Sequence, residues 1–291
     1  MNLILQKLNK CGKIYLERSV QTMYKPPRYG DPLFFKHSVS EMPRRKDFTM
    51  HAHNTYELIY FQDGNATHVI DDRKYKLRKG DLILVRPFQY HFIQIDAASR
   101  YERYDILFDN NQYHIDGLEL LPEDVDVINL EDNKLAQDIF RKCDLYCQTC
   151  DEALFSKILC HLLSELFINI HLFSHSSPGR VESFSPLIAE GLEYINERLC
   201  QIGDISEITG HLYVSDSYFF RLFKKELHCT PKRYICEKRL LLAYKMLSTG
   251  EKPADVFEKC GFKDYSTFYR NYTAFFGHSP KTGAANSILM R

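Results

Sequence analysis

The stretch Ser215-Asp-Ser-Tyr-Phe-Phe-Arg-Leu-Phe-Lys-Lys-Glu-Leu227 decides the fold of the C-terminal part of this 291-residue chain. Ser215 is a good helix N-cap, and apolar residues follow it at helical spacing, at Phe219, Leu222, Phe223 and Leu227. If these residues face inward, the outer face carries Ser217, Phe220, Arg221 and Lys224. Upstream, apolar residues at Ile205, Ile208, Leu212 and Val214 predict a shorter helix and a tight turn. Together the two segments predict a helix-turn-helix unit.

A second unit with the same pattern follows about 49 residues later. Its first helix and turn contain Val256, Phe257 and Cys260-Gly-Phe262, and Asp264 is the expected cap. The predicted buried stripe is Phe268, Tyr272, Phe275 and Phe276, and the outer face carries Tyr265, Ser266, Thr267, Tyr269 and Arg270. Arg221 and Arg270 each stand six residues after a cap, and an amphipathic helix over residues 233–247 separates the units. Such spacing suits two helices entering successive major grooves about 34 Å apart, where Arg can pair with guanine and Lys can contact phosphate.

The charge distribution agrees with a nucleic-acid partner for the C-terminal region. The whole chain has 38 basic and 38 acidic residues, but residues 211–291 contain 14 Lys and Arg against 7 Asp and Glu. The C-terminal region therefore has a modest positive field on which a polyanion can dock.

These C-terminal motifs resemble the AraC/XylS family of transcription regulators over roughly residues 185–291. The resemblance rests on Phe219-Phe-Arg-Leu-Phe-Lys-Lys225, Thr230-Pro231, Arg239, Cys260-Gly-Phe-Lys-Asp264, Tyr269-Arg270 and His278-Ser-Pro-Lys281. It implies that DNA is read by Ser217, Tyr218 and Arg221 in the first unit and by Tyr265, Ser266, Thr267, Tyr269 and Arg270 in the second. It also implies an activator, with RNA polymerase as a partner. Thr209 and Phe257 depart from the family pattern, since both stand where the family has a small alanine.

Residues 48–108 predict a small β-barrel or sandwich. Turn signals at Asp63-Gly-Asn65, Asp71-Asp72 and Lys79-Gly-Asp81 separate the predicted strands. These strands are Glu57–Phe61, Ala66–Ile70, Lys74–Leu77, Asp81–Val85, His91–Ile95 and Tyr104–Phe108.

Polar residues in these strands indicate a binding site. His51, His53 and Glu57 occupy alternate positions, so all three can point to one face of a strand. Together with Gly64, Gly80-Asp81, Pro87 and His91, they resemble the two motifs of cupin barrels and the sensor half of AraC-type regulators. In metal-binding cupins, three His and one Glu hold a divalent ion, and His51, His53, Glu57 and His91 stand in matching places.

Three roles stay open for these residues: contact with an organic ligand, binding of a divalent metal, or structure alone. The first is the favoured one, with His51, His53, Glu57, Tyr90 and His91 as ligand-binding residues and no obligatory cofactor. The family resemblance suggests a sugar or a similar polar metabolite, against which Tyr56, Tyr60, Tyr90 and Phe92 can stack.

From Asn133 to about Phe173 the apolar period becomes helical and predicts two helices. The inward positions expected for the first helix include Leu135, Ile139, Phe140 and Cys143. Related regulators dimerise at this place, and Leu154, Ile158, Leu162 and Leu166 offer an apolar seam, with an intradomain core as the equal alternative. Residues 174–180 are rich in turn formers and predict a linker.

The sequence thus predicts an α+β multidomain chain: an N-terminal arm (1–30), a cupin-like sensor barrel (31–131), a helical dimerisation or connector segment (132–173), a linker (174–184) and an all-α DNA-binding domain with two helix-turn-helix units (185–291). No apolar run reaches 18 residues, no signal peptide is recognisable, and the nine cysteines are scattered, so we expect a cytoplasmic protein with reduced thiols and no membrane partner. The expected function is ligand-responsive, sequence-specific regulation of transcription by a homodimer. The alternative is a cupin metalloenzyme with a helical appendix.

Overall fold

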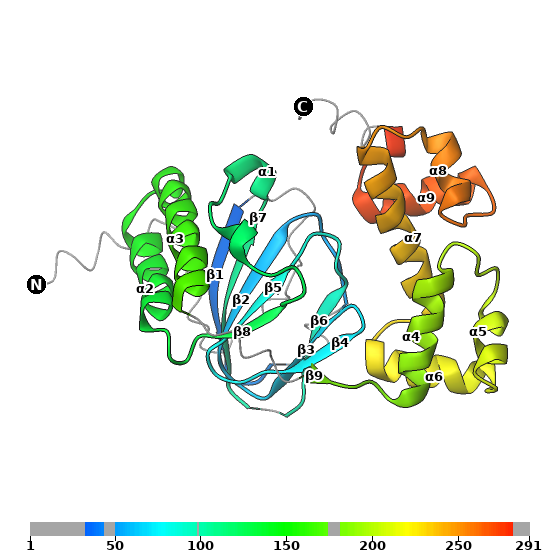
Figure 1. Cartoon of the computed structure of the whole chain (residues 1–291), viewed down its shortest axis with the longest axis horizontal. Helices are drawn as coiled ribbons and strands as arrows, with labels where there is room; N and C mark the ends of the chain where they lie inside the picture. The colour runs from blue at the N-terminus through cyan, green and yellow to red at the C-terminus, as the bar shows by residue number, and fades with distance from the viewer. Residues whose placement is uncertain (1–32, 44–49, 98, 174–180, 282–291) are drawn as a thin grey trace, which may run out of the picture. The chain divides into compact units, whose positions relative to one another are not determined.

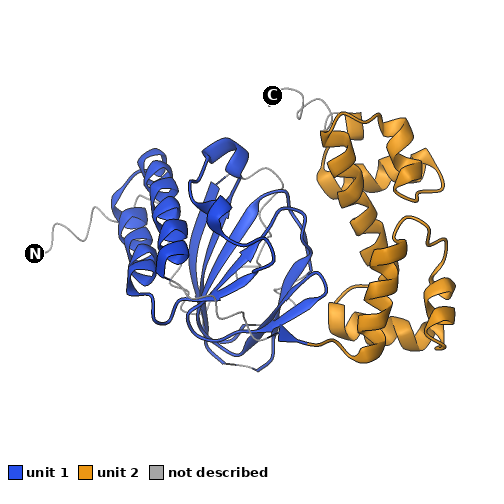
Figure 2. Ribbon diagram, viewed as in Figure 1, with its two compact units in different colours: residues 1–182 blue, residues 183–291 orange. Residues whose placement is uncertain are grey.

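The computed structural model describes residues 33–43, 50–97, 99–173 and 181–281. The chain forms two compact units, Met1–Glu182 and Ser183–Arg291, which Figure 2 shows in different colours. The predicted arm over residues 1–30 and most of the predicted linker, residues 174–180, lie outside the described residues.

The first unit contains two antiparallel sheets (Figure 1). The larger sheet has the strand order β1-β7-β2-β5-β8 and the smaller β6-β3-β4-β9. The strands are β1 Leu33–Ser40, β2 Tyr56–Asp63, β3 Ala66–Ile70, β4 Arg73–Lys76, β5 Asp81–Val85, β6 His91–Ile95, β7 Tyr101–Phe108, β8 Val127–Asn129 and β9 Val181–Glu182. All six strands predicted from the sequence are present within a few residues of their expected bounds, whereas β1, β8 and β9 were not predicted.

Two long helices, α2 Lys134–Thr149 and α3 Glu152–Phe173, follow the strands of the larger sheet (Figure 1). A short helix, α1 Asn110–Tyr113, and a 3-10 turn over Leu118–Leu120 stand between β7 and β8. Asn133 caps α2 by accepting a hydrogen bond of 3.0 Å from the backbone N–H of Ala136. The helix therefore begins where the sequence predicted it.

The larger sheet is buried on both faces because the two helices pack on its outer side. Leu58 and Tyr60 of β2 belong to the outer core, with Phe140 of α2 and Phe167 of α3. Ile59 and Phe61 belong to the inner core, which the two sheets share. Side chains of β2 thus alternate between two apolar layers.

Several sequence predictions about side-chain direction are wrong. Tyr56 stacks on Phe108 and Tyr60 stacks on Phe140 at 4.1 Å between ring centres, so both face the helices and not the barrel interior. Leu135 was expected to face inward but is 54% exposed, because the register of α2 places Ala136 in the core instead.

The expected apolar seam of α3 is divided between the core and the surface. Leu162 and Leu166 are buried in the core against the sheet, whereas Leu154 is 49% exposed. α3 is also the one helix, among the residues described, whose length and apolar composition match a membrane span. Six of its residues are buried against the sheet, whereas the apolar side chains of Leu154, Ile168, Leu172 and Phe173 are exposed.

Part of the predicted linker is a strand. Val181 and Glu182 form β9, which pairs with Tyr75 and Lys74 of β4 and so adds a fourth strand to the smaller sheet. The residues are exposed and too few to show a strand period, so the sequence alone did not reveal them.

Over its described residues, 183–281, the second unit contains helices and no strand (Figure 1). Its core is formed by the apolar stripes predicted from the sequence, including Phe219, Phe223, Phe268 and Tyr272, although Phe275 is only half-buried. The helices are α4 Pro186–Arg198, α5 Ile205–His211, α6 Asp216–Leu227, α7 Pro231–Ser248, α8 Pro253–Lys259 and α9 Tyr265–Phe276.

Candidate functional sites

Helices α6 and α9 begin at the caps that the sequence predicted. The Ser215 hydroxyl accepts a hydrogen bond from the backbone N–H of Tyr218. The Asp264 carboxylate accepts one of 2.7 Å from the N–H of Thr267, and these backbone bonds lower the pKa of Asp264. Each cap fixes the first turn of the helix that carries the candidate base-reading residues.

The two residues that depart from the family pattern each connect the helices of their unit. Thr209 of α5 is buried, and its hydroxyl donates a hydrogen bond to the carboxylate of Asp216 in the first turn of α6. Phe257 of α8 packs edge-on against Tyr265 at 5.7 Å and lies 6.5 Å from Phe268, both on α9. Both helix-turn-helix pairs are therefore held together by specific side-chain contacts.

The outer face of each helix is accessible at most of the predicted positions. Ser217, Tyr218, Arg221 and Lys224 of α6 are exposed, as are Ser266, Tyr269 and Arg270 of α9. The guanidinium of Arg221 lies 5.5 Å from the centre of the Tyr218 ring, a cation–π contact that orients both side chains. Tyr265 and Thr267 are half-buried, Tyr265 because it packs on Phe257.

Tyr213 is an exposed aromatic that the sequence patterns missed. It lies in the turn between α5 and α6, is 95% exposed and has φ of 54°, the left-handed region that favours glycine. A turn residue belongs to no helical period, so periodicity could not single it out.

A half-buried arginine connects the two helix-turn-helix units. Arg239 of α7 donates hydrogen bonds of 2.8 and 2.6 Å to the carbonyls of Leu199 and Ile202, which precede α5, and one of 2.9 Å to that of Gly261, between α8 and α9. Burial lowers the pKa of this guanidinium, and the three carbonyls satisfy its donors. Arg239 therefore fixes the spacing between the two helix-turn-helix pairs of the second unit.

In the first unit, the structure brings His51, His53, Glu57 and His91 together; we call these four residues the histidine cluster. One nitrogen or oxygen atom from each lies within 4.8 Å of the corresponding atom of the other three. His51 and His91 pair through their backbones, with N–H to O distances of 3.1 and 2.9 Å, which brings two distant segments together. All but His51 are buried.

Glu57 is the electrostatic centre of the histidine cluster. Its Oε2 atom lies 3.1 Å from Nε2 of His53 and 2.7 Å from Nε2 of His91. Burial acts to raise the pKa of Glu57, but the imidazoles of His91 and His53 outweigh it and hold the pKa well below its usual value. Burial likewise acts to lower the pKa of His91, and the charge of Glu57 raises it. The cluster therefore favours a carboxylate with positive charge beside it.

A second polar group, His68, Arg103 and Asp105, faces the same interior and was missed by the sequence. Arg103 and Asp105 of β7 form an ion pair of 2.7 Å and are almost wholly buried. Burial raises the pKa of Asp105 to about 6. His68 of β3 lies 6.0 Å from His91 between ring centres, and neither of its ring nitrogens has a hydrogen-bond partner among the described residues. Buried polar atoms without partners are rare in folded proteins, so the two ring nitrogens of His68 are candidates for hydrogen bonds to a polar ligand.

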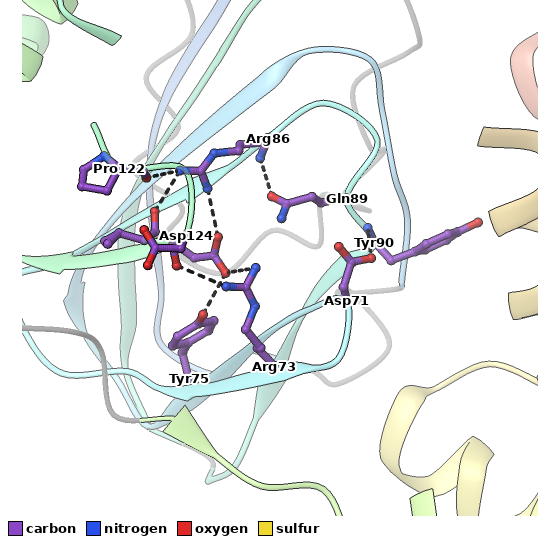
Figure 3. Close-up of polar contacts among 10 residues, drawn as sticks. Asp71, Arg73, Tyr75, Arg86, Gln89, Tyr90, Pro122 and Asp124 are labelled. Atoms are coloured by element: carbon purple, nitrogen blue, oxygen red, sulfur yellow. Dashed lines mark hydrogen bonds and ion pairs between the residues drawn. The ribbon is translucent and has the colours of Figure 1, made fainter. Parts of the chain in front are cut away.

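The predicted ligand contacts Tyr90 and Phe92 do not face the interior between the two sheets. Tyr90 and Phe92 flank His91, and neighbouring residues of an extended chain point to opposite faces. Figure 3 shows the ring of Tyr90 pointing away from the side chains of Arg73, Tyr75 and Arg86. Both aromatic residues are fully buried, but neither belongs to the core shared by the sheets.

The polar contacts in Figure 3 connect β4 of the smaller sheet to the chain beside β5 and β8 of the larger sheet. The buried carboxylate of Asp126 lies 2.8 Å from a guanidinium nitrogen of Arg73 and 3.0 Å from one of Arg86, and it accepts a hydrogen bond from Tyr75. Arg86 also donates to the carbonyls of Pro122 and Val125. These contacts anchor the chain before β8 to β4 and to the end of β5, which makes their role structural.

Two family models match the chain. One, described as an AraC-like ligand binding domain, matches residues 39–168, and the other, a helix-turn-helix domain, matches residues 208–284. The first contains the histidine cluster, and the second contains both candidate recognition helices.

Curated relatives match along most of the chain. An uncharacterized HTH-type transcriptional regulator, YfiF of Bacillus subtilis, is 22% identical over 92% of this chain and 88% of its own length. The HTH-type transcriptional activator RhaR of Cronobacter sakazakii is 25% identical over 80% of this chain and 86% of its own. Among solved structures, ToxT of Vibrio cholerae is 13% identical over 86% of this chain and 97% of its own, with a TM-score of 0.35.

Proposed function

The chain belongs to the AraC family of transcription regulators, and we propose that it reads DNA through the outer faces of α6 and α9 while its first unit binds a small polar effector. The observation that carries the proposal is the repetition of an exposed arginine, Arg221 and Arg270, on two capped helices of one compact unit. Two helices held at a fixed separation can follow one face of a duplex.

The proposed DNA contacts divide by chemistry. Arg221 and Arg270 reach base edges, and Lys224 contacts phosphate, because guanidinium can pair with guanine in two hydrogen bonds whereas ammonium acts as a point charge. The other proposed contacts to bases and backbone are Ser217, Tyr218, Tyr265, Ser266, Thr267 and Tyr269.

Replacing Arg221 or Arg270 with Ala tests this assignment. We expect each change to weaken binding to the selected site by about 1–3 kcal/mol, with little loss on random DNA. The site is first selected from a genomic DNA pool, and binding is then measured at fixed salt, because phosphate contacts make affinity strongly salt-dependent. Arg141→Ala, a change to an exposed arginine of the first unit, is the matched control. Equal losses on specific and random DNA would contradict base reading.

For the effector we propose a sugar or similar polyhydroxyl metabolite, bound by His51, His53, Glu57 and His91 together with the second polar group. Support comes from the mixture of donors and acceptors in one buried interior, which includes the unpartnered nitrogens of His68. Hydroxyl groups can satisfy both kinds of partner without bringing charge into the core.

Changing His68 to Phe tests the effector site. We expect the variant to lose effector-induced thermal stabilisation while it keeps its affinity for the DNA site, since α6 and α9 lie in the other unit. The probe is a panel of sugars, screened by thermal shift on the wild-type chain. If the variant is stabilised by the same sugar to the same extent as the wild type, His68 does not contact the effector.

We further propose a cytoplasmic homodimer that activates transcription with RNA polymerase and has no catalytic activity. Exposed apolar side chains on α3, namely Leu154, Ile168, Leu172 and Phe173, support dimerisation through this helix. Ile168→Asp should shift sedimentation from dimer to monomer, whereas Leu120→Asp, at an exposed leucine outside α2 and α3, should not. A wild-type chain that sediments as a monomer would refute the dimer.

A further inference from the structure

We propose that Phe220 reads a thymine in the DNA site by packing its ring against the 5-methyl group of that base. This inference rests on the proposed function, because it adds a base contact to the outer face of α6. The contacts proposed above for that face, such as Ser217 and Arg221, act through polar or charged groups. Phe220 lies among them without a polar atom in its side chain, so a purely polar interface does not account for it.

Phe220 lies on the part of α6 that can reach base edges. It is the fifth residue of this helix, and the N-terminal residues of a recognition helix are those that contact bases. Successive residues of an α-helix are about 100° apart, so Ser217, Phe220 and Arg221 lie within about 100° of one another around the helix axis. A helix that turns Arg221 toward the base edges therefore brings Phe220 into the same groove.

Phe220 lies outside the buried stripe of α6. The preceding residue, Phe219, is fully buried and packs on Phe223, with 5.5 Å between ring centres. Phe220 is partly exposed, and no described residue contributes a second ring in contact with it. One exposed apolar side chain is common on protein surfaces and carries no argument by itself. Its position and its repetition in α9 carry the argument.

The same arrangement recurs in α9. Phe220 stands five positions after the cap of α6 and directly before Arg221. Tyr269 stands five positions after the cap of α9, directly before Arg270, and is 41% exposed. Each recognition helix thus has an accessible ring directly before an exposed arginine. Because neither ring is needed in the core, the repetition indicates a shared role on DNA.

Thymine offers such a ring an apolar partner in the major groove. Its edge carries a methyl group, which no other base of unmodified DNA has, and phenylalanine is among the side chains that contact this group. Removing one methyl group from water contributes about 4-fold in affinity. We therefore expect the selected DNA site to contain a thymine close to the base that Arg221 reads.

The test removes the methyl group from the DNA and leaves the protein unchanged. The full-length chain selects a site from genomic DNA, and each thymine of that site is then replaced, one at a time, by deoxyuridine, which keeps the same hydrogen-bonding groups. We expect one replacement, close to the base pair whose preference Arg221→Ala relaxes, to raise the Kd of the wild type by about 4-fold at fixed salt. Phe220→Ala should bind thymine and deoxyuridine at this position with equal affinity.

Phe275→Ala is the matched control. Phe275 is likewise a partly exposed phenylalanine of the second unit, but it lies about 180° around α9 from Ser266 of the outer face. This variant should keep the wild-type preference for thymine over deoxyuridine. Phe220→Leu, which keeps a smaller apolar side chain, should reduce the preference without abolishing it.

Two results would overturn the inference: a selected site in which no deoxyuridine replacement weakens wild-type binding, or a Phe220→Ala variant that still prefers thymine at the sensitive position. If Phe220→Ala does not fold, Phe220→Leu decides, because an unchanged preference in that variant also overturns the inference. A chain that selects a DNA site but detects no thymine methyl group refutes the role of Phe220 and leaves the proposed function intact. A chain that selects no site refutes both.

Discussion

Gly261 allows the two helix-turn-helix units to approach each other closely. It has φ of 81°, and a Cβ atom at this position would lie 2.3 Å from the carbonyl oxygen of Cys200 and 3.0 Å from the guanidinium carbon of Arg239. The carbonyl oxygen of Cys200 and the guanidinium of Arg239 both lie at the contact between the two helix-turn-helix units. The requirement for glycine here is therefore steric as well as conformational.

Gly261→Ala should lower the free energy of unfolding of the second unit by more than about 1–2 kcal/mol, because a left-handed alanine adds its own cost to the clash. Chemical denaturation followed by circular dichroism measures the change. Gly210→Ala is the control. Gly210 lies in α5, and apart from its chain neighbours and its own helix backbone no atom of the described residues comes within 4 Å of where its Cβ would stand, so alanine should be neutral or stabilising there. If Gly261→Ala and Gly210→Ala change the unfolding free energy equally, the close approach at Gly261 does not contribute to stability.

Arg239 acts at the same contact through hydrogen bonds. Arg239→Met keeps the apolar stem but leaves the carbonyls of Leu199, Ile202 and Gly261 without their donor. We expect a loss of about 3 kcal/mol or more in unfolding free energy, because hydrogen bonds from a charged donor contribute about 1.5–3 kcal/mol each. Arg198→Ala, at an exposed arginine of α4, should change stability by less than about 0.5 kcal/mol. If Arg239→Met leaves the unfolding free energy unchanged, the proposed stabilising role of Arg239 is refuted.

At the scale of elements, α2 is attached to the larger sheet through a polar contact around His37 of β1. Its ring stacks on Tyr104 at 3.9 Å, its Nε2 lies 2.9 Å from Glu102, and its Nδ1 lies 3.1 Å from Asp144 of α2. Tyr104 also donates to Asp144. Burial opposes the charge on His37, but Asp144 and Glu102 outweigh it and raise the pKa.

Raising the pH should therefore loosen α2. A histidine whose folded-state pKa is raised stabilises the fold fully below its unfolded pKa and loses that contribution as pH rises through the folded value. Between pH 6 and pH 9 we expect the wild type to lose about 1 kcal/mol more than His37→Gln, or about 2–4 °C in Tm. Parallel pH profiles of the two proteins, measured by thermal melting of the first unit, would contradict this role.

Elements with strong local signals were predictable, and residues that depend on tertiary contacts were not. Residues that are close in sequence determine helix caps and apolar stripes. The structure confirms the predicted caps Ser215 and Asp264 and the predicted stripes of α6 and α9. Alternation also placed His51, His53 and Glu57 on one face. The expected contacts of Tyr56 and Tyr60 with a ligand are wrong because, with Glu57 facing inward, alternation along β2 places both on the opposite face. Burial of β2 on both faces left no apolar signal to mark the inside. His68, Arg103 and Asp105 had no signal, since each is a single polar residue in a strand.

At the scale of the whole molecule, each unit has a buried core of its own. We expect two transitions in scanning calorimetry, because domains commonly unfold as separate cooperative units. Arg239→Met should lower the midpoint of one transition, and Phe140→Ala, which opens the core beneath α2, should lower that of the other. A single transition that both variants shift equally would show that the units unfold as one.

The pairing of β9 with β4 determines where the protein can be cut. Residues 174–180 look like a natural boundary for cloning or limited proteolysis, but Val181 and Glu182 on their far side belong to the ladder of the smaller sheet. A nick within 174–180 would leave that strand attached to the wrong fragment and expose the backbone of β4, an open edge that invites self-association. Fragments separated between Glu182 and Ser183 keep every described strand with its own sheet.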